Sequence, residues 1–323
     1  MLSKFSYKRV TTVSEAVAAA GRPGARILAG GTDLLGCLRD EVFTADAVVS
    51  LSGIKALKGI SARPGGGLRI GALTTLSEVA TDRQVLSSYP VLAQAAAAAA
   101  SPQLRNQGTI GGNICQRPRC WYFRGDFHCL RKGGEICFAA SGESEFHCIF
   151  GGAPCFIVHP SDTAPALVAL DASVSIAGAK GTRTIPLASF FVLPAVNVLK
   201  ENVLVPGEVV TEILLAPPQA GARSTYRKVR DRGAFDFALA GAAIVLAMTD
   251  GKVRAARIVL SGVAPIPWRC AEAEKVLVGK SLDAATVAQA AAAAVKDAAP
   301  LSKNEFKVPL TLGVLEETLL GLG

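Results

Sequence analysis

Two glycine-rich loops constrain the fold of this chain more than any other feature of its sequence. Gly30-Gly31 lies between the apolar segment 26–29, which predicts a strand, and a helix expected over 34–41. The second loop, 108–113, follows a helix that should stop at Ser101-Pro102. Because glycine has no Cβ, such a loop lets the backbone approach a ligand closely, and the N–H groups at a helix start favour an anion. The loops therefore predict a pyrophosphate site, although a Gly-Gly turn can also be purely structural.

The common nucleotide-binding fingerprints are absent. No G-x-G-x-x-G stretch occurs, and Gly279-Lys280-Ser281 is not a P-loop because Glu274 stands where its leading glycine would be. Each glycine pair is followed by short polar residues, Thr32-Asp33 and Asn113, and the first of these can cap the next helix. Two such loops in one region favour a ligand-binding role.

Short helices and strands are expected to alternate through the first two thirds of the chain. The segments 12–15 and 75–78 have capping-box spacing, and the first should begin a helix over about residues 14–20. Beyond the cysteine-rich region, the stretches FIVH, ALVAL and SVSIAG, at 156–159, 166–170 and 173–178, are expected to form short strands.

A second domain is expected after the segment Ala216-Pro217-Pro218. Two apolar segments flank Asp250-Gly251, a strong hairpin signal, and a helix-forming stretch follows over 282–299. The chain is therefore predicted to have an α+β fold with a domain boundary near residue 218. The C-terminal part, 219–323, should combine an antiparallel sheet with helices.

The charge of the chain excludes some partners and permits others. With 34 Lys and Arg against 26 Asp and Glu, the net charge is +8, but the basic residues are dispersed apart from small groups at 117–124 and 223–232. No basic patch interleaved with aromatic residues is present, so nucleic acid is not expected as a partner. Local basic groups suit a cofactor phosphate or the acidic surface of a partner subunit equally well.

No targeting or membrane segment is expected. No apolar run approaches the roughly 18 residues of a spanning helix, and the N-terminus lacks the apolar core of a signal peptide. We expect a cytoplasmic protein with no membrane span, while export together with a partner subunit remains compatible with the sequence.

Five of the eight cysteines lie between Cys120 and Cys155. Three uses compete for such a group. Disulfides are typical of secreted domains, and nothing here indicates secretion. A structural zinc site usually has paired C-x2-4-C knuckles, which this segment lacks. An iron-sulfur cluster needs four converging thiolates, but the spacing fits no general ferredoxin pattern, so the residues alone leave the choice open.

Five ordered motifs resemble the flavin-binding subunits of the xanthine dehydrogenase family of molybdenum hydroxylases, and they cover essentially the whole chain. The motifs are LAGGTDLL, LRNQGTIGGN, HPSDTAPALVALDA, PGEVVTEILL and YRKVRDRGAFDFALAGAA. The resemblance implies a two-subdomain FAD-binding domain of the vanillyl-alcohol-oxidase type over 1–218, with subdomains at about 1–58 and 59–218, followed by the C-terminal α+β domain.

The same resemblance implies which residues bind FAD. The pyrophosphate should be wrapped by the two loops, Asp162 should meet the ribose or pyrophosphate region, and Val210 and Lys228 should lie near the isoalloxazine. A cation beside the flavin N1/O2 edge favours the anionic reduced flavin. The residues of the two loops are Ala29, Gly30, Gly31, Thr32, Asp33 and Leu34, and Thr109, Ile110, Gly111, Gly112 and Asn113.

Between Asn113 and Asp162 lie 48 residues, where most relatives pass almost directly from one motif to the next. A subset that includes 4-hydroxybenzoyl-CoA reductase and certain aldehyde oxidoreductases carries an additional [4Fe-4S] cluster in this loop, here 114–160. The resemblance implies that its ligands are Cys120, Cys129, Cys137 and Cys155, spaced C-x8-C-x7-C-x17-C. Cys115 and Cys148 are expected not to be ligands. If one of the four assigned cysteines is not a ligand, Cys148 is the first substitute for it.

The implied function is electron transfer within a heterotrimer. A large subunit would carry the molybdenum cofactor and a small subunit two [2Fe-2S] clusters, since this chain has no motif for either. FAD and the [4Fe-4S] cluster would connect these centres to an external carrier such as ferredoxin, in either direction, with no catalytic acid or base from this chain. Two alternatives remain: a stand-alone FAD-dependent NAD(P)H oxidoreductase, and a module with a structural zinc site.

Overall fold

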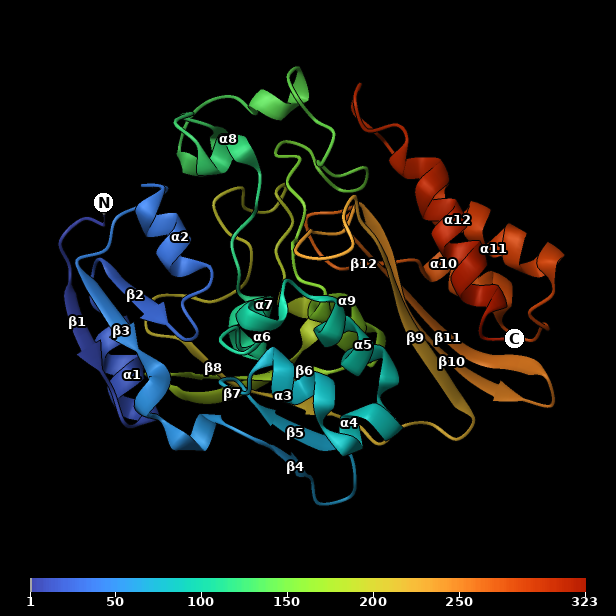
Figure 1. Cartoon of the computed structure of the whole chain (residues 1–323), viewed down its shortest axis with the longest axis horizontal. Helices are drawn as coiled ribbons and strands as arrows, with labels where there is room; N and C mark the ends of the chain where they lie inside the picture. The colour runs from blue at the N-terminus through green and yellow to red at the C-terminus, as the bar shows by residue number, and fades with distance from the viewer. Residues whose placement is uncertain (1) are drawn as a thin grey trace.

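Three β-sheets organise the chain in a computed structural model, which describes residues 2–323. The first sheet holds β1 (Ser6–Arg9), β3 (Ala47–Ser50) and β2 (Ala25–Leu28) in that order, and its strand pairs are parallel. Parallel neighbours need crossover connections, which α1 (Val13–Ala20) and the segment containing α2 (Leu34–Arg39) supply. This unit lies at the left of Figure 1.

The second sheet has five antiparallel strands in the order β4-β5-β8-β6-β7. The strands are β4 (Ile60–Ala62), β5 (Leu68–Gly71), β8 (Val209–Leu215), β6 (Ser173–Gly178) and β7 (Gly181–Pro186). Its helices are α3 (Leu76–Thr81), α4 (Arg83–Ser88), α5 (Pro90–Ala98), α6 (Pro102–Arg105), α7 (Ile110–Ile114) and α9 (Thr163–Ala169). One large apolar core joins the sheet to these helices, apart from α6, which has no buried residue.

The two predicted helix starts behave differently. At α3 the capping box is complete, because Thr75 and Glu78 each accept from the backbone N–H of the other. At α1, Thr12 accepts from the N–H of Glu15, but the Glu15 carboxylate binds the N–H of Thr11, so only half of the box forms.

Two of the strands predicted after the cysteine-rich region are wrong. Residues 166–170 lie in and just after α9, and every residue of α9 is buried. A helix buried on all sides has no amphipathic period, so its apolar run is easily mistaken for a strand. Residues 156–159 form an irregular segment, whose backbone bonds go to Cys148 and Ala264 rather than to a ladder. The third predicted strand is β6.

The third sheet is antiparallel, in the order β12-β11-β10-β9. Its strands are β9 (Ala222–Val229), β10 (Ala240–Thr249), β11 (Lys252–Ser261) and β12 (Trp268–Arg269). The predicted hairpin at Asp250-Gly251 is confirmed. One face packs on α10 (Ala271–Leu277), α11 (Ala284–Val295) and α12 (Lys307–Leu320), while Ala243 and Val259 on the other face join the core of the second sheet. The helix expected over 282–299 is α11, which is shorter and covers 284–295.

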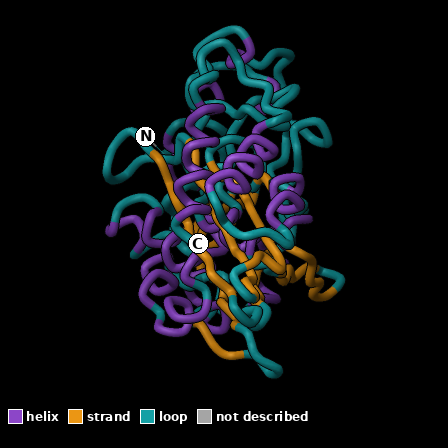
Figure 2. The backbone as a smooth tube through the Cα atoms, turned by 90° about the vertical axis from the view of Figure 1, so that its right-hand side faces the viewer, coloured by secondary structure: helices purple, strands orange, loops and turns teal. Residues whose placement is uncertain are grey.

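The cysteine-rich segment forms a lobe above the other elements (Figure 1), and Figure 2 shows that it is mostly loop. It contains α8 (Trp121–Arg124) and short 3-10 turns at Leu130–Lys132 and Phe138–Ala140. Phe123 and Cys129 pack against Cys37 of α2 and Val42, so the lobe is fixed to the segment that follows the first glycine loop. No helix in the described chain is long and apolar enough to cross a membrane.

Candidate functional site

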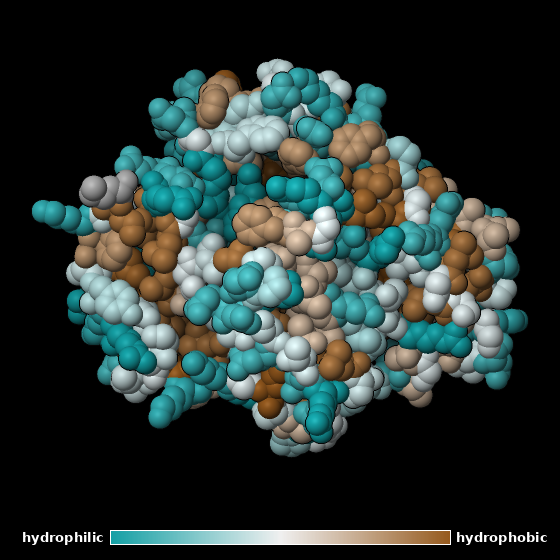
Figure 3. Space-filling model, viewed as in Figure 1, coloured by the Kyte–Doolittle hydropathy of each residue, from teal (hydrophilic) through white to brown (hydrophobic). Residues whose placement is uncertain are grey.

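A cavity of about 600 Å³ lies where the two glycine loops meet. Twelve of the fourteen residues expected to bind FAD line it: Ala29, Gly30, Gly31, Thr32, Asp33, Leu34, Thr109, Gly111, Gly112, Asn113, Asp162 and Val210. Ile110 instead lies in the apolar core with no exposed surface, and Lys228 lies behind Asp162. The molecule is hollowed beneath the cysteine-rich lobe, as Figure 3 shows.

The two loops pack directly on each other, and this contact needs glycine. A Cβ on Gly30 would come within 1.8 Å of the Gln107 carbonyl oxygen, and Gly31 has a φ of +76°, which side chains rarely adopt. The first loop therefore meets the start of the second through bare backbone, and residues of both loops line the one cavity.

The loops differ in what they offer a ligand. The backbone N–H groups of Gly31, Thr32 and Asp33 donate to no other residue in the described chain, so they are available to an anion. In the second loop, the N–H groups of residues 110–113 donate to Thr74, Ala72 and Thr109. The amides of residues 110–113 are therefore not available to a ligand, and the loop presents its Cα surface and the Thr109 and Asn113 side chains.

Asp33 does not cap α2 with its side chain, contrary to the expectation for Thr32-Asp33. Its carboxylate accepts hydrogen bonds from the Arg117 N–H at 2.7 Å, from Arg119 Nη1 at 2.6 Å and from Arg124 Nη2 at 2.7 Å. These residues begin the cysteine-rich segment. Asp33 thus joins the first glycine loop to that segment at the edge of the cavity.

Asp162 is held by two groups from the C-terminal sheet. Lys228 Nζ donates to its Oδ2 at 2.8 Å, and the Tyr226 hydroxyl donates to its Oδ1 at 2.7 Å. Burial raises the pKa of Asp162, while the Lys228 ammonium acts in the opposite direction. The carboxylate is therefore part of the cavity wall and also the anchor of the β9 side chains.

Several residues of the cavity wall were not predicted. They include Arg117, Arg119, the segment 204–209 and the segment 235–237. A sequence signal existed for two of these groups, since the arginines belong to the small basic group at 117–124 and Pro206-Gly207 begins one of the quoted motifs. The segment 235–237 also lies within a quoted motif, YRKVRDRGAFDFALAGAA, although no residue of it was assigned to the site.

The four predicted cluster ligands line one small cavity inside the lobe. Cys120, Cys129, Cys137 and Cys155 are joined there by aromatic side chains and by Arg131 and His147. Cys115 and Cys148 do not line it. All eight cysteines of the chain are free thiols, and no group of three or more His, Cys, Asp or Glu side chains in residues 2–323 is arranged to hold a single metal ion.

The four thiols are close enough to affect one another. The Cys155 thiol donates to Cys137, which lowers the pKa of Cys137 and raises that of Cys155. Burial raises the pKa of Cys120 to about 11, and the His147 Nε2 atom lies 3.2 Å from its sulfur. Neither His147 nor Arg131 was assigned a role at this cavity from the sequence.

Comparisons with known proteins cover almost the entire chain. Residues 3–217 match the family described as the FAD binding domain in molybdopterin dehydrogenase, and residues 224–321 match the CO dehydrogenase flavoprotein C-terminal domain. The chain is 39% identical to the aldehyde oxidoreductase FAD-binding subunit PaoB of Escherichia coli, over 98% of both chains. It is 31% identical to the carbon monoxide dehydrogenase medium chain of Hydrogenophaga pseudoflava, over 90% of this chain and 86% of the relative.

Solved structures agree with these matches. A chain of carbon monoxide dehydrogenase from Hydrogenophaga pseudoflava superposes with a TM-score of 0.80 and 27% identity, covering 100% of this chain and 98% of the other. A chain of quinoline 2-oxidoreductase from Pseudomonas putida 86 gives 0.78 and 25% identity over 100% and 98%. The chain therefore belongs to the family of FAD-binding subunits of the multi-subunit molybdenum oxidoreductases.

Proposed function

We propose that the 600 Å³ cavity holds FAD and that this chain is the electron-transfer flavoprotein of a molybdenum hydroxylase-type complex. The observation that carries the proposal is that both glycine loops, Asp162 and Val210 line one cavity. Bound together, FAD and a [4Fe-4S] cluster would link the [2Fe-2S] clusters of a partner subunit to an external donor or acceptor such as ferredoxin.

The residues of the first loop suit the pyrophosphate. The free N–H groups at 31–33 can donate to phosphate oxygens, and Arg117 and Arg119 line the same cavity. The Asp33 carboxylate would repel a phosphate if it were unpaired, but its two oxygens already accept from the N–H of Arg117 and from the Arg119 and Arg124 guanidinium groups. In this proposal Asp33 orders the arginines and leaves the backbone to bind the anion.

Lys228 is proposed to lie near the isoalloxazine, held in place by its ion pair with Asp162 of the cavity wall. Its side chain is only 3% exposed and its Nζ also donates to the Ala98 carbonyl at 3.2 Å, next to Ala99 and Ala100 of the cavity wall. The ammonium is therefore fixed just behind the wall rather than free in the cavity.

The lobe is proposed to hold an extra [4Fe-4S] cluster, as in the 4-hydroxybenzoyl-CoA reductase type of this family. Four thiols face one enclosed cavity with Tyr122, Phe123 and Phe138 on its walls, which is the donor set that such a cluster requires. Arg131 lines the same cavity, and its buried Nε and Nη2 atoms, which have no N or O partner, are proposed to donate to sulfur.

The partners are proposed from the relatives. Medium chains of carbon monoxide dehydrogenases and FAD-binding subunits of xanthine dehydrogenases are among them, so we propose a molybdopterin-containing large subunit and a small subunit with two [2Fe-2S] clusters. A cytoplasmic location and a boundary near residue 218 between a vanillyl-alcohol-oxidase-type FAD domain and the C-terminal domain complete the proposal. The gap between the matched regions, 3–217 and 224–321, supports that boundary.

The decisive experiment measures FAD, iron, acid-labile sulfide and zinc per chain in anaerobically purified protein, together with the EPR spectrum after dithionite reduction. We expect one FAD and about four irons, with the iron lost in Cys129→Ala. Cys148→Ala is the matched control, since Cys148 is also buried but lies outside the cavity, and it should retain the iron.

Other outcomes select the alternatives. Stoichiometric zinc without iron would support a structural zinc site and leave only the flavin part of the proposal. Rapid NAD(P)H oxidation by the isolated chain would support a stand-alone oxidoreductase. Loss of iron in Cys148→Ala but not in Cys129→Ala would show that the ligand set is wrong.

A further inference from the structure

Arg131 is the most deeply buried charged group of the cysteine-rich lobe. Its side chain is 1% exposed and lines the same cavity as the four cysteines. Its Nε and Nη2 atoms are buried and donate to no nitrogen or oxygen in residues 2–323. A buried cation normally satisfies all its N–H groups, so two open donors at a cavity of thiols call for an acceptor there.

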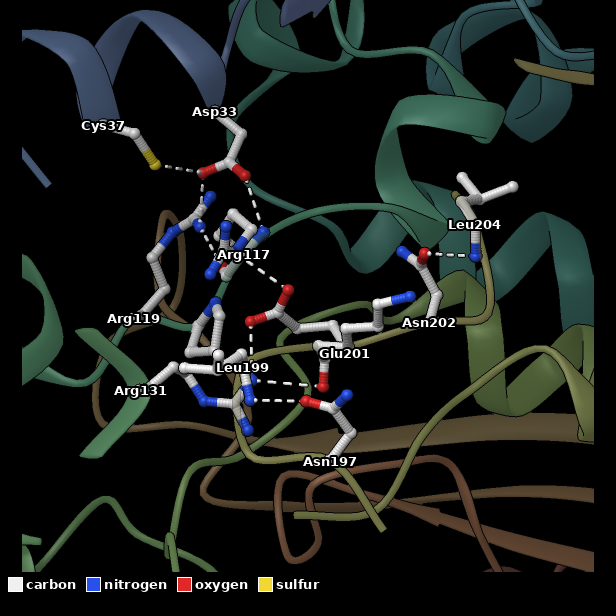
Figure 4. A network of polar contacts seen from close by, with 12 residues as sticks. Asp33, Cys37, Arg117, Arg119, Arg131, Asn197, Leu199, Glu201, Asn202 and Leu204 are labelled. Carbon is white, nitrogen blue, oxygen red and sulfur yellow. Dashed lines mark hydrogen bonds and ion pairs between the residues drawn. The ribbon is translucent and has the colours of Figure 1, made fainter. Parts of the chain in front are cut away.

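Glu201 holds Arg131 in this position. Arg131 Nη1 donates to Glu201 Oε1 at 2.7 Å and to the Lys200 carbonyl at 3.2 Å, and Arg117 Nε lies 2.9 Å from Glu201 Oε2 (Figure 4). Only one nitrogen of Arg131 is used by these bonds. Its Nε and Nη2 atoms are left without a partner.

The surrounding charges leave an excess of positive charge. Arg117, Arg119, Arg124 and Arg131 surround two carboxylates, Asp33 and Glu201, which gives the connected network a net charge of +2. Within this network, Asp33 lines the large cavity and Arg131 lines the small cavity of the four cysteines. No carboxylate in the network faces the four cysteines, so the positive charge of Arg131 acts on them directly.

We propose that Arg131 donates hydrogen bonds to the sulfur atoms of the iron-sulfur cluster and thereby raises its reduction potential, while Glu201 holds it and opposes its charge. The proposal rests on the proposed function, because it requires the cluster. Reduction adds one electron and no proton, so the reduced cluster is more negative by one charge. A fixed cation in a buried site stabilises that reduced form more than the oxidised one.

The test is an EPR-monitored redox titration, with dithionite as the electron donor, of the anaerobically purified full chain. Arg131→Met should lower the midpoint potential of the cluster and change the g-values, while Arg131→Lys, which keeps the charge but loses the fork, should lower it less. Glu201→Gln should shift the potential upward, because it removes the opposing negative charge. Arg39→Met is the control, since it removes an exposed arginine of α2 and should leave the potential unchanged.

Each outcome has one meaning. A cluster signal with the same potential in Arg131→Met, Glu201→Gln and the parent chain would overturn the inference and leave the cluster itself established. Absence of iron from the parent chain would overturn the proposed function instead. If Arg131→Met fails to retain iron, Arg131→Lys decides, because it keeps the charge and loses the fork, and an unchanged potential in Arg131→Lys refutes the hydrogen-bonding role of Arg131.

Discussion

The Nζ atom of Lys228 lies 2.8 Å from the Oδ2 atom of Asp162, which is 66 positions earlier in the chain. Both side chains are almost fully buried, with 3% and 6% of their surface exposed. The pair connects β9 of the C-terminal sheet to the segment that leads into α9, and the Tyr226 hydroxyl completes the contact. The wall of the large cavity therefore depends on an ion pair between the two regions matched by different families.

Breaking this pair should destabilise the chain in a pH-dependent way. In Lys228→Met the buried Asp162 loses its cation, at a cost of about 3–5 kcal/mol near neutral pH. Burial already raises the pKa of Asp162 above its ordinary value of 3.8, and removal of Lys228 raises it further. Because the folded state then binds a proton more readily than the unfolded state, the loss of stability should shrink as the pH falls toward 3.8.

Thermal unfolding of Lys228→Met and the parent chain between neutral and mildly acidic pH checks this. Lys275→Met, which breaks an exposed pair with Glu272, should change Tm little at any pH. A Tm difference for Lys228→Met that stays constant across the range would contradict the assignment of the effect to Asp162.

Gly30→Ala should separate the two glycine loops. Its Cβ would meet the Gln107 carbonyl oxygen at 1.8 Å, so one backbone must move. We expect FAD affinity to fall at least about tenfold, which is roughly 1.4 kcal/mol. Gly36→Ala in α2 is the matched control, because only Arg124 Nη1 lies near its Cβ, at 3.8 Å. The control should retain FAD and gain about 0.5–1 kcal/mol of stability. Fluorescence-monitored titration with FAD measures the affinity of both variants and of the parent chain. An FAD affinity of Gly30→Ala equal to that of the parent chain would refute the role of this contact.

Asp33→Asn should loosen the start of the cysteine-rich segment. The carboxylate binds three donors from 117–124, and its side chain is 18% exposed, so we expect a loss of about 2 kcal/mol, below the ~3–5 kcal/mol of a fully buried pair. Hydrogen exchange of residues 117–124 should accelerate, whereas Asp40→Asn, which affects only an exposed pair with Arg39, should leave it unchanged. Unchanged exchange in Asp33→Asn would show that other contacts hold this segment.

Lys307 should make stability rise at alkaline pH. It is buried with no exposed surface, its Nζ donates to the Gly262 carbonyl at 2.8 Å, and burial lowers its pKa to about 8. Between about 8 and the ordinary 10.5, the unfolded state binds the proton more readily, so stability increases with pH through this window, by a total on the order of 3 kcal/mol. Lys307→Met should abolish that rise. Urea unfolding at both ends of this pH window measures the free energy of unfolding of the parent chain and of Lys307→Met. The same dependence on pH in both chains would contradict the prediction.

Local signals in the sequence predicted local structure well. The capping box at Thr75 and Glu78 and the hairpin at Asp250-Gly251 form as expected, because each is decided by residues within a few positions of one another. The expectation failed where burial overrode local pattern. Residues 166–170 were expected as a strand because a helix buried on every side carries no period in its sequence.

The cap expected from Asp33 failed for a related reason. A carboxylate before a helix can accept from the helix N–H groups, but here three donors from residues 117–124 compete for it. Local sequence cannot weigh donors that arrive from more than 80 positions away, as the separations of 84, 86 and 91 residues show.

The sequence by itself determined the family, through five ordered motifs, and the residue types that the proposed chemistry needs: paired glycines, four spaced cysteines and short polar residues beside the loops. Only the tertiary structure decided that Gly30 faces Gln107, that Lys228 pairs with Asp162, and that Arg131 faces the cysteines while Glu201 holds it. The physical reason is that charge pairs and backbone contacts between distant segments depend on distance in space, which no pattern along the chain records.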